Sequence, residues 1–437
     1  MTSIPAGASD QGAGAKPGHV GESVVVSSEA LRRENITLDP SNAARISLPF
    51  LGVGGLLLIV AIVAAVTQPN GLKHALGAYH VGFMSVLAIT LGAMFWTMVM
   101  YLVNAGWFGP LRRQFENIFT MVGVCAALFV PILAIELFSS GVLFKWMNPE
   151  VTAGDVIYDV KAPFLNSPFF IVRAVIYFVV WGVLAYRLSS LSLEQDRTGD
   201  RWLTQKARYT SGWGVLLFAL TTAFAGFDWL MTLDYHFFST MWGVYFFAGG
   251  AFGSLALVAT QLGLLRRAGR LDGVVTEEHS HDLGKLLFGF SVFWAYIAFS
   301  QYFLIYYSNI PEETAFYLAR MQDWLPLTIV IVAGHFVFPF FVLLPRPLKR
   351  RAGWIGVVGA LLLLVHLLDT TWVVRPMIYL KSEAPDPGLA GMWIDIAGTG
   401  GVVCVYLGFL IRRVFSVPLV AFNDPRIARG LGHKNYV

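Results

Sequence analysis

Long runs of apolar residues, separated by short polar connections, occupy most of the chain from residue 46 onward. Such runs match the length of about 20 residues that a helix needs to cross roughly 30 Å of hydrocarbon. They are continuous and do not alternate with a period of two, so they predict helices and argue against a closed β-barrel. The predicted spans lie at residues 46–67, 79–104, 117–143, 168–188, 209–232, 239–265, 285–307, 324–344, 354–373 and 391–411.

This pattern divides the chain into three parts. Residues 1–44 contain much Gly, Ala, Ser and Glu and no apolar run, which is typical of a flexible tail. Residues 45–412 hold the ten predicted spans, and residues 413–437 form a C-terminal tail. The predicted fold class is therefore an all-α integral membrane protein with ten transmembrane helices.

The composition agrees with a membrane protein and argues against a soluble one. Apolar residues make up 56% of the chain and charged residues only 13%. The mean hydropathy is +0.63. A soluble chain of this length needs roughly a quarter of its residues charged to cover its surface.

Basic residues indicate how the chain is oriented. Most of the 31 Lys and Arg residues lie in the two tails and in the connections after the second, fourth, sixth and eighth spans. By the positive-inside rule, both termini are predicted to be cytoplasmic. The net charge of +4 thus combines a basic inner face with an acidic outer face. A basic inner rim is ordinary for membrane proteins, so we expect no nucleic-acid partner.

Signals for a cofactor held by this chain are weak. Cys125 and Cys404 are isolated within spans, without a CxxCH motif or a cysteine cluster, and are interpreted as packing residues. His335 and His366 are the best pair for a b-type haem. At about 1.5 Å per residue, however, their predicted depths below the outer surface differ, about 18 Å against about 11 Å. The sequence therefore predicts no haem and no metal bound by this chain.

Ionisable residues inside the spans are predicted to gather in the outer half of the bundle, whereas the cytoplasmic half offers little beyond one histidine. Each such residue costs several kcal/mol unless it is paired or hydrated, so each is a functional candidate. Glu136, Arg173 and Asp228 lie in the third to fifth spans, and His366 and Asp369 share one face of the ninth. Two interpretations remain open: a proton relay serving a membrane-soluble carrier, or a structural ion pair of Arg173 with Glu136 or Asp228.

Three further residues are weaker candidates for a quinone pocket: His80 at the predicted start of the second span, and Gln301 and Tyr302 in the seventh. Such a pocket needs flat apolar walls and one or two polar anchors. The alternatives are interfacial hydration for His80, and likewise for Asp395, and an aromatic belt around Tyr302. The acidic, proline-interrupted connection 144–167 is a candidate docking surface.

Several blocks of the chain resemble one known family. The most specific are FDWLMTLD (227–234), HDLGKLLF (281–288), FWAYIAFSQYF (293–303) and NIPEET (309–314). These blocks are similar to the ActF family of membrane subunits of bacterial alternative complex III. The resemblance implies an NrfD-like fold, also found in polysulfide-reductase membrane subunits. In that fold, spans 2–5 and 6–9 form two four-helix bundles, flanked by spans 1 and 10.

The resemblance also implies a place in a complex of the bacterial cytoplasmic membrane. That complex oxidises menaquinol or ubiquinol and passes electrons through an iron–sulfur subunit and multihaem cytochrome c subunits to a cytochrome c or a terminal oxidase. Haem and iron–sulfur clusters would then belong to partner subunits. A paralogous NrfD-like membrane subunit is the better-supported quinol oxidation site in such complexes.

We therefore expect a membrane subunit of a quinol:electron-acceptor oxidoreductase, free of covalently bound cofactors, that contributes quinone binding, proton conduction or both. One alternative is a purely structural membrane anchor for cytochrome and iron–sulfur subunits on the outer face. A second alternative is a secondary transporter, which would require polar residues at the midplane and broken helices.

Overall fold

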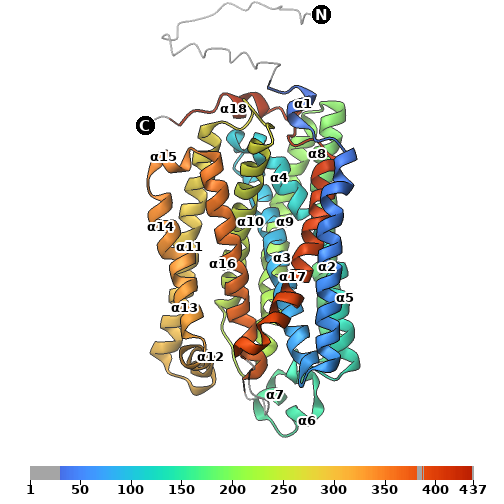
Figure 1. The fold of residues 1–437 in the computed structure, drawn as a ribbon, viewed down its shortest axis with the longest axis vertical. Helices are drawn as coiled ribbons and strands as arrows, with labels where there is room; N and C mark the ends of the chain where they lie inside the picture. Colours follow the sequence, from blue (N-terminus) through green and yellow to red (C-terminus); the bar gives the residue numbers. More distant parts are fainter. Residues whose placement is uncertain (1–29, 381–385, 387, 436–437) are drawn as a thin grey trace, which may run out of the picture.

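Ten long helices run side by side in the computed structural model of the protein (Figure 1). The structure describes residues 30–380, 386 and 388–435, and these contain helices and connections but no strand. All ten predicted spans are present as helices long and apolar enough to cross a membrane. They are formed by α2 (Ser41–Thr67), α3 (Gly71–Leu102), α4 and α5 (Gly109–Phe119, Val122–Phe138), α8 (Ser167–Thr198), α9 (Trp202–Trp229), α10 (Trp242–Arg267), α11 (Glu277–Ser308), α13 and α14 (Leu325–Val332, Phe338–Leu343), α16 (Ala352–Tyr379) and α17 (Met392–Ser416).

The remaining elements are short. One of them, the π-helical turn Ala333–Val337, lies within the eighth span and joins α13 to α14. The other short helices are α1 (Arg33–Ile36), α6 (Pro149–Thr152), α7 (Val156–Lys161), α12 (Pro311–Gln322), α15 (Arg346–Lys349) and α18 (Ile427–Leu431), with 3₁₀ turns at Gly106–Phe108, Lys145–Met147, Met231–Leu233 and Gly388–Gly391.

Several helices extend beyond the apolar runs that predict them. α3 begins at Gly71 and not at residue 79, and α16 continues to Tyr379 and not only to residue 373. Hydropathy underestimates these helices because their polar end residues pack against protein and not lipid. Of the predicted N-terminal tail, residues 1–29 lie outside the described residues, while α1 and the first turn of α2 fall within its remainder.

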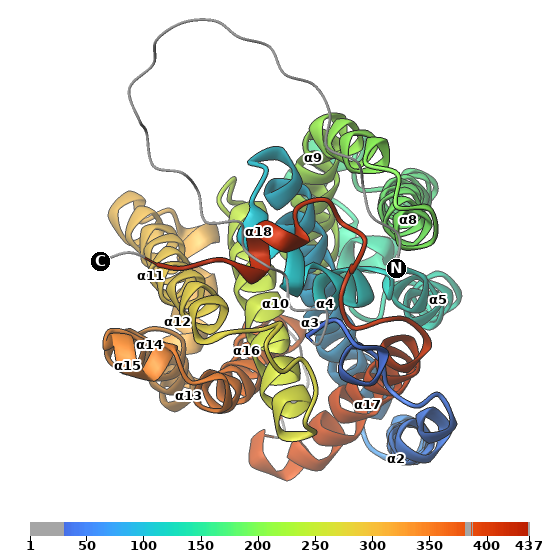
Figure 2. The ribbon, with the colours of Figure 1, turned by 90° about the horizontal axis from the view of Figure 1, so that it is seen from above.

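α3 and α10 lie at the centre of the bundle when it is viewed along its length (Figure 2). Their backbones approach closely at two glycines: a methyl group on Gly92 would lie 2.1 Å from the carbonyl oxygen of Gly250. Gly250 is therefore a helix-packing residue. Its neighbour Gly249 differs, because a methyl group there would meet only the His366 ring, at 3.7 Å.

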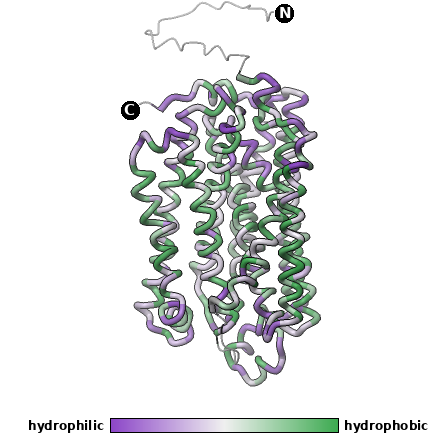
Figure 3. The backbone as a smooth tube through the Cα atoms, viewed as in Figure 1, coloured by the Kyte–Doolittle hydropathy of each residue, from purple (hydrophilic) through white to green (hydrophobic). Residues whose placement is uncertain are grey.

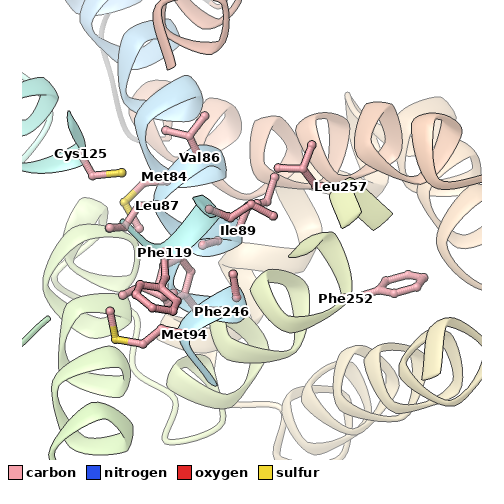
Figure 4. Packing of buried hydrophobic residues seen from close by; sticks show 14 of the residues in the cluster. Met84, Val86, Leu87, Ile89, Met94, Phe119, Cys125, Phe246, Phe252 and Leu257 are labelled. Atoms are coloured by element: carbon pink, nitrogen blue, oxygen red, sulfur yellow. The ribbon is translucent and has the colours of Figure 1, made fainter. Parts of the chain in front are cut away.

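The other helices surround this central pair. α5 and α9 pack beside α3, and α8 packs against both of them. α11 and α16 pack on α10; α11 also contacts α14, and α16 contacts α13. α2 and α17 pack along each other and against α3. Figure 4 shows part of the core where these elements meet, including Cys125, which is fully buried beside α3 as a packing residue.

The first and last described helices, α1 and α18, lie at the same end of the bundle (Figure 1), which we call the termini end. Apolar residues dominate the middle of the bundle, and polar residues gather towards its two ends (Figure 3). The chain after α17 folds across the termini end, where Leu419, Val420 and Ala421 are fully buried. The described part of the C-terminal tail is therefore packed against the bundle.

Candidate functional site

A cavity of about 650 Å³ lies between α11, α12, α13 and α16. Its walls are mostly aromatic and aliphatic, although eight of the sixteen lining side chains also carry an O–H or N–H group. The aromatic lining residues include Trp294, Phe299, Tyr302, Tyr317, Phe336 and Trp372. A volume of this size with flat walls suits a ring compound with part of an aliphatic tail.

One edge of the cavity is exposed along α11. Tyr296 and Phe299 line it and are 64% and 63% exposed, near the middle of a membrane-spanning helix. Exposed aromatic side chains at that depth face lipid. A lipid-soluble ligand can therefore enter the cavity from the membrane.

Two residues that line the rear wall of the cavity donate hydrogen bonds to a buried carboxylate, that of Asp369. The Tyr245 hydroxyl donates a hydrogen bond to Asp369 Oδ1, and Trp294 Nε1 donates to Asp369 Oδ2 at 3.3 Å. Tyr245 and Trp294 both line the cavity, whereas Asp369 lies behind them and is 4% exposed. Tyr245 and Trp294 thus connect the wall of the cavity to Asp369.

His335 and His366 lie close together in the structure, although their predicted depths differ. Their ring centroids are 6.5 Å apart, and His335 Nδ1 lies 3.8 Å from Asp369 Oδ2. The predicted depths depend on where the two helices are assumed to end. Because α16 continues to Tyr379, His366 lies about 20 Å from that end at about 1.5 Å per residue. His335 lies about 15 Å from the start of α13 on the same scale. The absence of haem stays a prediction.

His366 and Asp369 share one face of α16, but no hydrogen bond joins them within the described part of the chain. His366 Nε2 lies 3.3 Å from the carbonyl oxygen of Ser85, and its Nδ1 is buried without a partner there. A small cavity of about 20 Å³ is lined by His366, Asp369 and Tyr245. One water needs roughly 10–15 Å³, so a single water molecule fits there and can connect the three groups.

Arg320 supplies a positive charge to the large cavity. It is completely buried in α12 and donates hydrogen bonds to the carbonyl oxygens of Phe316, Trp372 and Val373. The carbonyl of Trp372 is free to accept because residue 376, four positions later, is a proline without an N–H group. A proline in α16 thus fixes an arginine from another helix at the cavity.

No carboxylate neutralises Arg320 among the described residues. Its guanidinium carbon lies 3.3 Å from the ring centroid of Phe316 and 4.6 Å from that of Trp372. Burial lowers the pKa of Arg320 to about 9, although Tyr317 and Tyr245 counteract this effect. The side chain therefore remains a cation at neutral pH, in surroundings that supply only neutral partners.

A second polar cluster lies apart from the cavity, around Asp228 of α9. Arg173 donates two hydrogen bonds of 2.8 Å to its carboxylate, and Tyr177 donates a third of 2.7 Å. The remaining Arg173 nitrogen donates to the carbonyl oxygen of Phe164 at 2.8 Å. Both charges are neutralised and hydrogen-bonded, as expected for a structural ion pair.

Glu136 and His80 also make structural contacts. Glu136 accepts hydrogen bonds from the backbone N–H groups of Leu143 and Phe144, at 2.9 and 3.1 Å. His80 lies about two and a half turns into α3, is fully buried and contacts the carbonyl oxygen of Trp229 at 2.7 Å. Interfacial hydration of His80 is therefore excluded.

The two candidates from α11 separate in the structure. Tyr302 lines the large cavity. Gln301 is buried on another face of the helix, where it accepts a hydrogen bond of 2.6 Å from Ser239. Asp395 is not simply hydrated either, because it pairs with Arg375 at 2.9 Å and with His74 at 3.2 Å.

The expectation that the half towards the termini end holds little beyond His335 is wrong. Arg112 and Arg113 of α4 both contact Glu116, at 2.9 and 3.0 Å, and all three are buried. Arg112 also pairs with Asp424 of the C-terminal segment. Burial alone would raise the pKa of Asp424, but Arg112 and Arg426 outweigh it and hold that pKa below its ordinary value. This network joins α4 to the C-terminal segment.

No protein-family model matches the chain, and no curated protein matches it. Among the residues described, no three His, Cys, Asp or Glu side chains gather into a group that could hold a metal ion.

Proposed function

We propose that this chain is a membrane subunit of a respiratory quinol:electron-acceptor oxidoreductase, and that the large cavity binds the quinol head group. The observation that carries the proposal is the hydrogen-bonded contact between the cavity wall and buried Asp369. A quinol site needs flat apolar walls, entry from lipid and an acceptor for the ring proton. The cavity supplies all three requirements.

Proton transfer follows from the geometry of Tyr245. Its hydroxyl donates to Asp369 and can accept a hydrogen bond from a ring hydroxyl in the cavity. As the ring proton moves to the tyrosine oxygen, the tyrosine proton moves to Asp369. The O–H bond of the ring breaks, and an O–H bond forms on the carboxylate. His335, and His366 through one water molecule, are the next proton acceptors.

The family resemblance supplies the rest of the proposal. Electrons would pass to iron–sulfur and multihaem cytochrome c subunits, and from there to a cytochrome c or a terminal oxidase. A paralogous NrfD-like subunit would share the complex, in the cytoplasmic membrane of a bacterium. The positive-inside rule places the termini end in the cytoplasm. Partners would then dock at the opposite end, where Val156 and Val160 of α7 are 74% and 78% exposed.

A structural role is the second candidate, and the Arg173 and Asp228 pair favours it. That pair is fully hydrogen-bonded and does not line the large cavity. The chain would then act as an anchor for its partners. A secondary transporter fits less well: His335 lies in a π-helical turn near the midplane, but the exposed edge of the large cavity runs along the lipid-facing side of α11.

Asp369→Asn tests the proposal, with Asp228→Asn as the matched control. Asparagine can keep both contacts at position 369, since its oxygen can accept from Trp294 and its amide can donate to Tyr245. The complex should therefore assemble, while quinol:acceptor turnover and proton release in proteoliposomes should fall. Asp228→Asn should instead reduce assembly, because Arg173 loses its counter-charge. Normal turnover in Asp369→Asn would favour the structural anchor.

A further inference from the structure

Arg320 gives the large cavity a fixed positive charge without a matching negative one among the described residues. We infer that the cavity binds its ring ligand preferentially as an anion, with an ionised ring oxygen directed at Arg320. The inference rests on the proposed quinol site and names the charge state that the site selects.

The hydrogen-bonding pattern of Arg320 leaves room for such a ligand. A guanidinium has five N–H donors; three carbonyl oxygens of the described chain each accept one bond and the Met377 sulfur accepts a fourth at 3.5 Å, which leaves one N–H on Nη2. Carbonyl oxygens satisfy donors but carry no full charge. A buried ion that lacks a counter-charge strongly favours an oppositely charged neighbour.

The direction of approach follows from the aromatic rings beside Arg320. Phe316 and Trp372 lie near the guanidinium carbon, at 3.3 and 4.6 Å from their centroids. A ligand oxygen therefore has to approach the remaining Nη2 N–H at the edge of the guanidinium. Other lining residues also carry polar groups, but the Tyr245 hydroxyl is bonded to Asp369, and the hydroxyl of Thr328 already accepts a hydrogen bond from Trp372 Nε1 at 2.8 Å.

The chemical class of ligand is an aromatic ring that carries an ionisable oxygen: a hydroxyquinone, or a quinol that has lost one proton. A neutral quinone carbonyl would gain an ordinary hydrogen bond, whereas an ionised oxygen gains a charge-assisted one that is about twice as strong. Proton transfer through Tyr245 produces this ionised species, so Arg320 and Asp369 favour the same step. No electron moves in that step.

Equilibrium binding to the full-length chain in nanodiscs of zwitterionic lipid tests the inference. The probes are an alkylated 2-hydroxy-1,4-naphthoquinone, ionised at neutral pH, and its neutral 2-methoxy ether. Quenching of the fluorescence of Trp294 and Trp372 reports occupancy. The hydroxy compound should bind at least about tenfold more tightly, a ratio equivalent to about 1.4 kcal/mol. The preference should vanish at a pH that protonates the ring hydroxyl.

Variants of Arg320 separate its charge from its shape. Arg320→Gln should bind the two compounds equally, whereas Arg320→Lys should keep a preference for the anion. A preference that survives in Arg320→Gln would overturn the inference. If Arg320→Gln fails to fold, two other measurements still test the inference: the pH dependence of the preference in the wild type, and the preference of Arg320→Lys for the anion.

The remaining outcomes distinguish the inference from the proposal beneath it. Equal binding of both compounds by the wild type overturns the inference and leaves the quinol site standing. Binding of neither compound overturns both. If phosphatidylglycerol in the nanodisc abolishes binding of the hydroxy compound, a lipid phosphate is the anion at Arg320, and the assignment of a ring ligand fails.

Discussion

Tyr245→Phe is the sharpest test of the proton route, because it removes one oxygen atom and keeps the ring that lines the cavity. The hydroxyl of Tyr245 is the group that joins the cavity to Asp369 and can both accept and donate a proton. Trp294 also contacts Asp369, but its indole N–H is only a donor and cannot accept the ring proton. The variant therefore removes the route and leaves the pocket in place.

The expected loss is large in rate and small in stability. Removing one positioned acid–base group lowers a proton-transfer rate by about 10²–10⁴-fold. This corresponds to about 3–5 kcal/mol of barrier. Asp369 keeps the hydrogen bond from Trp294, so the variant should lose no more than the roughly 1–3 kcal/mol expected when a buried acceptor loses a donor.

The assay is quinol:acceptor turnover by the purified complex, normalised to the amount of assembled chain. Tyr307→Phe is the control: this tyrosine of α11 does not line the cavity and makes no contact with Asp369 in the described structure. Its turnover should stay close to that of the wild type. Equal turnover in the two variants, at equal assembly, would refute a proton route through Tyr245.

Three other predictions concern stability and assembly. Arg173→Gln leaves a buried carboxylate unpaired at a cost of about 3–5 kcal/mol, so the yield of assembled complex should fall before the turnover per complex does; an unchanged yield would argue against the structural pair. Gly250→Ala places a methyl group 2.4 Å from a backbone carbonyl oxygen of α3. It should lower the free energy of unfolding in detergent by about 1–3 kcal/mol, whereas Gly249→Ala should leave it nearly unchanged. Cysteines at the exposed positions Asp159 and Glu312 should react with an impermeant maleimide in the free subunit and be protected in the complex, and equal labelling in both states would count against docking there.

Hydropathy is enough to predict the ten spans, because helices that face lipid must be apolar along most of their length. It predicts their ends poorly. The polar first turns of α3 and the last turn of α16 pack against protein, so they resemble connections in the sequence. Those few residues misplace His80 and His366 along their helices.

The candidate site could be predicted only in part for a related reason. Asp369 and His366 are conspicuous as polar residues in an apolar run, but Tyr245 and Trp294 are two among 16 tyrosines and 13 tryptophans. Their roles depend on the packing of α10 and α11 against α16, which hydropathy does not describe. Arg320 lies in a short helix between two spans and was missed. The proline at position 376 indicates that one carbonyl group of α16 lacks its helical hydrogen-bond donor. The sequence does not say which other donor binds that carbonyl group.

The unequal burial of the helices has a consequence for how the cavity works. In their most apolar stretches, α3 and α10 are 89% and 83% buried within the protein, whereas α11 and α13 are only 33% and 17% buried. The carboxylate therefore lies on the side of the cavity that protein holds in place. In a membrane the other side faces lipid tails, so the width of the cavity should respond to bilayer thickness and lateral pressure. The surrounding lipid is in this sense a component of the proposed binding site. Transfer to a detergent micelle therefore changes the site itself and not only its surroundings.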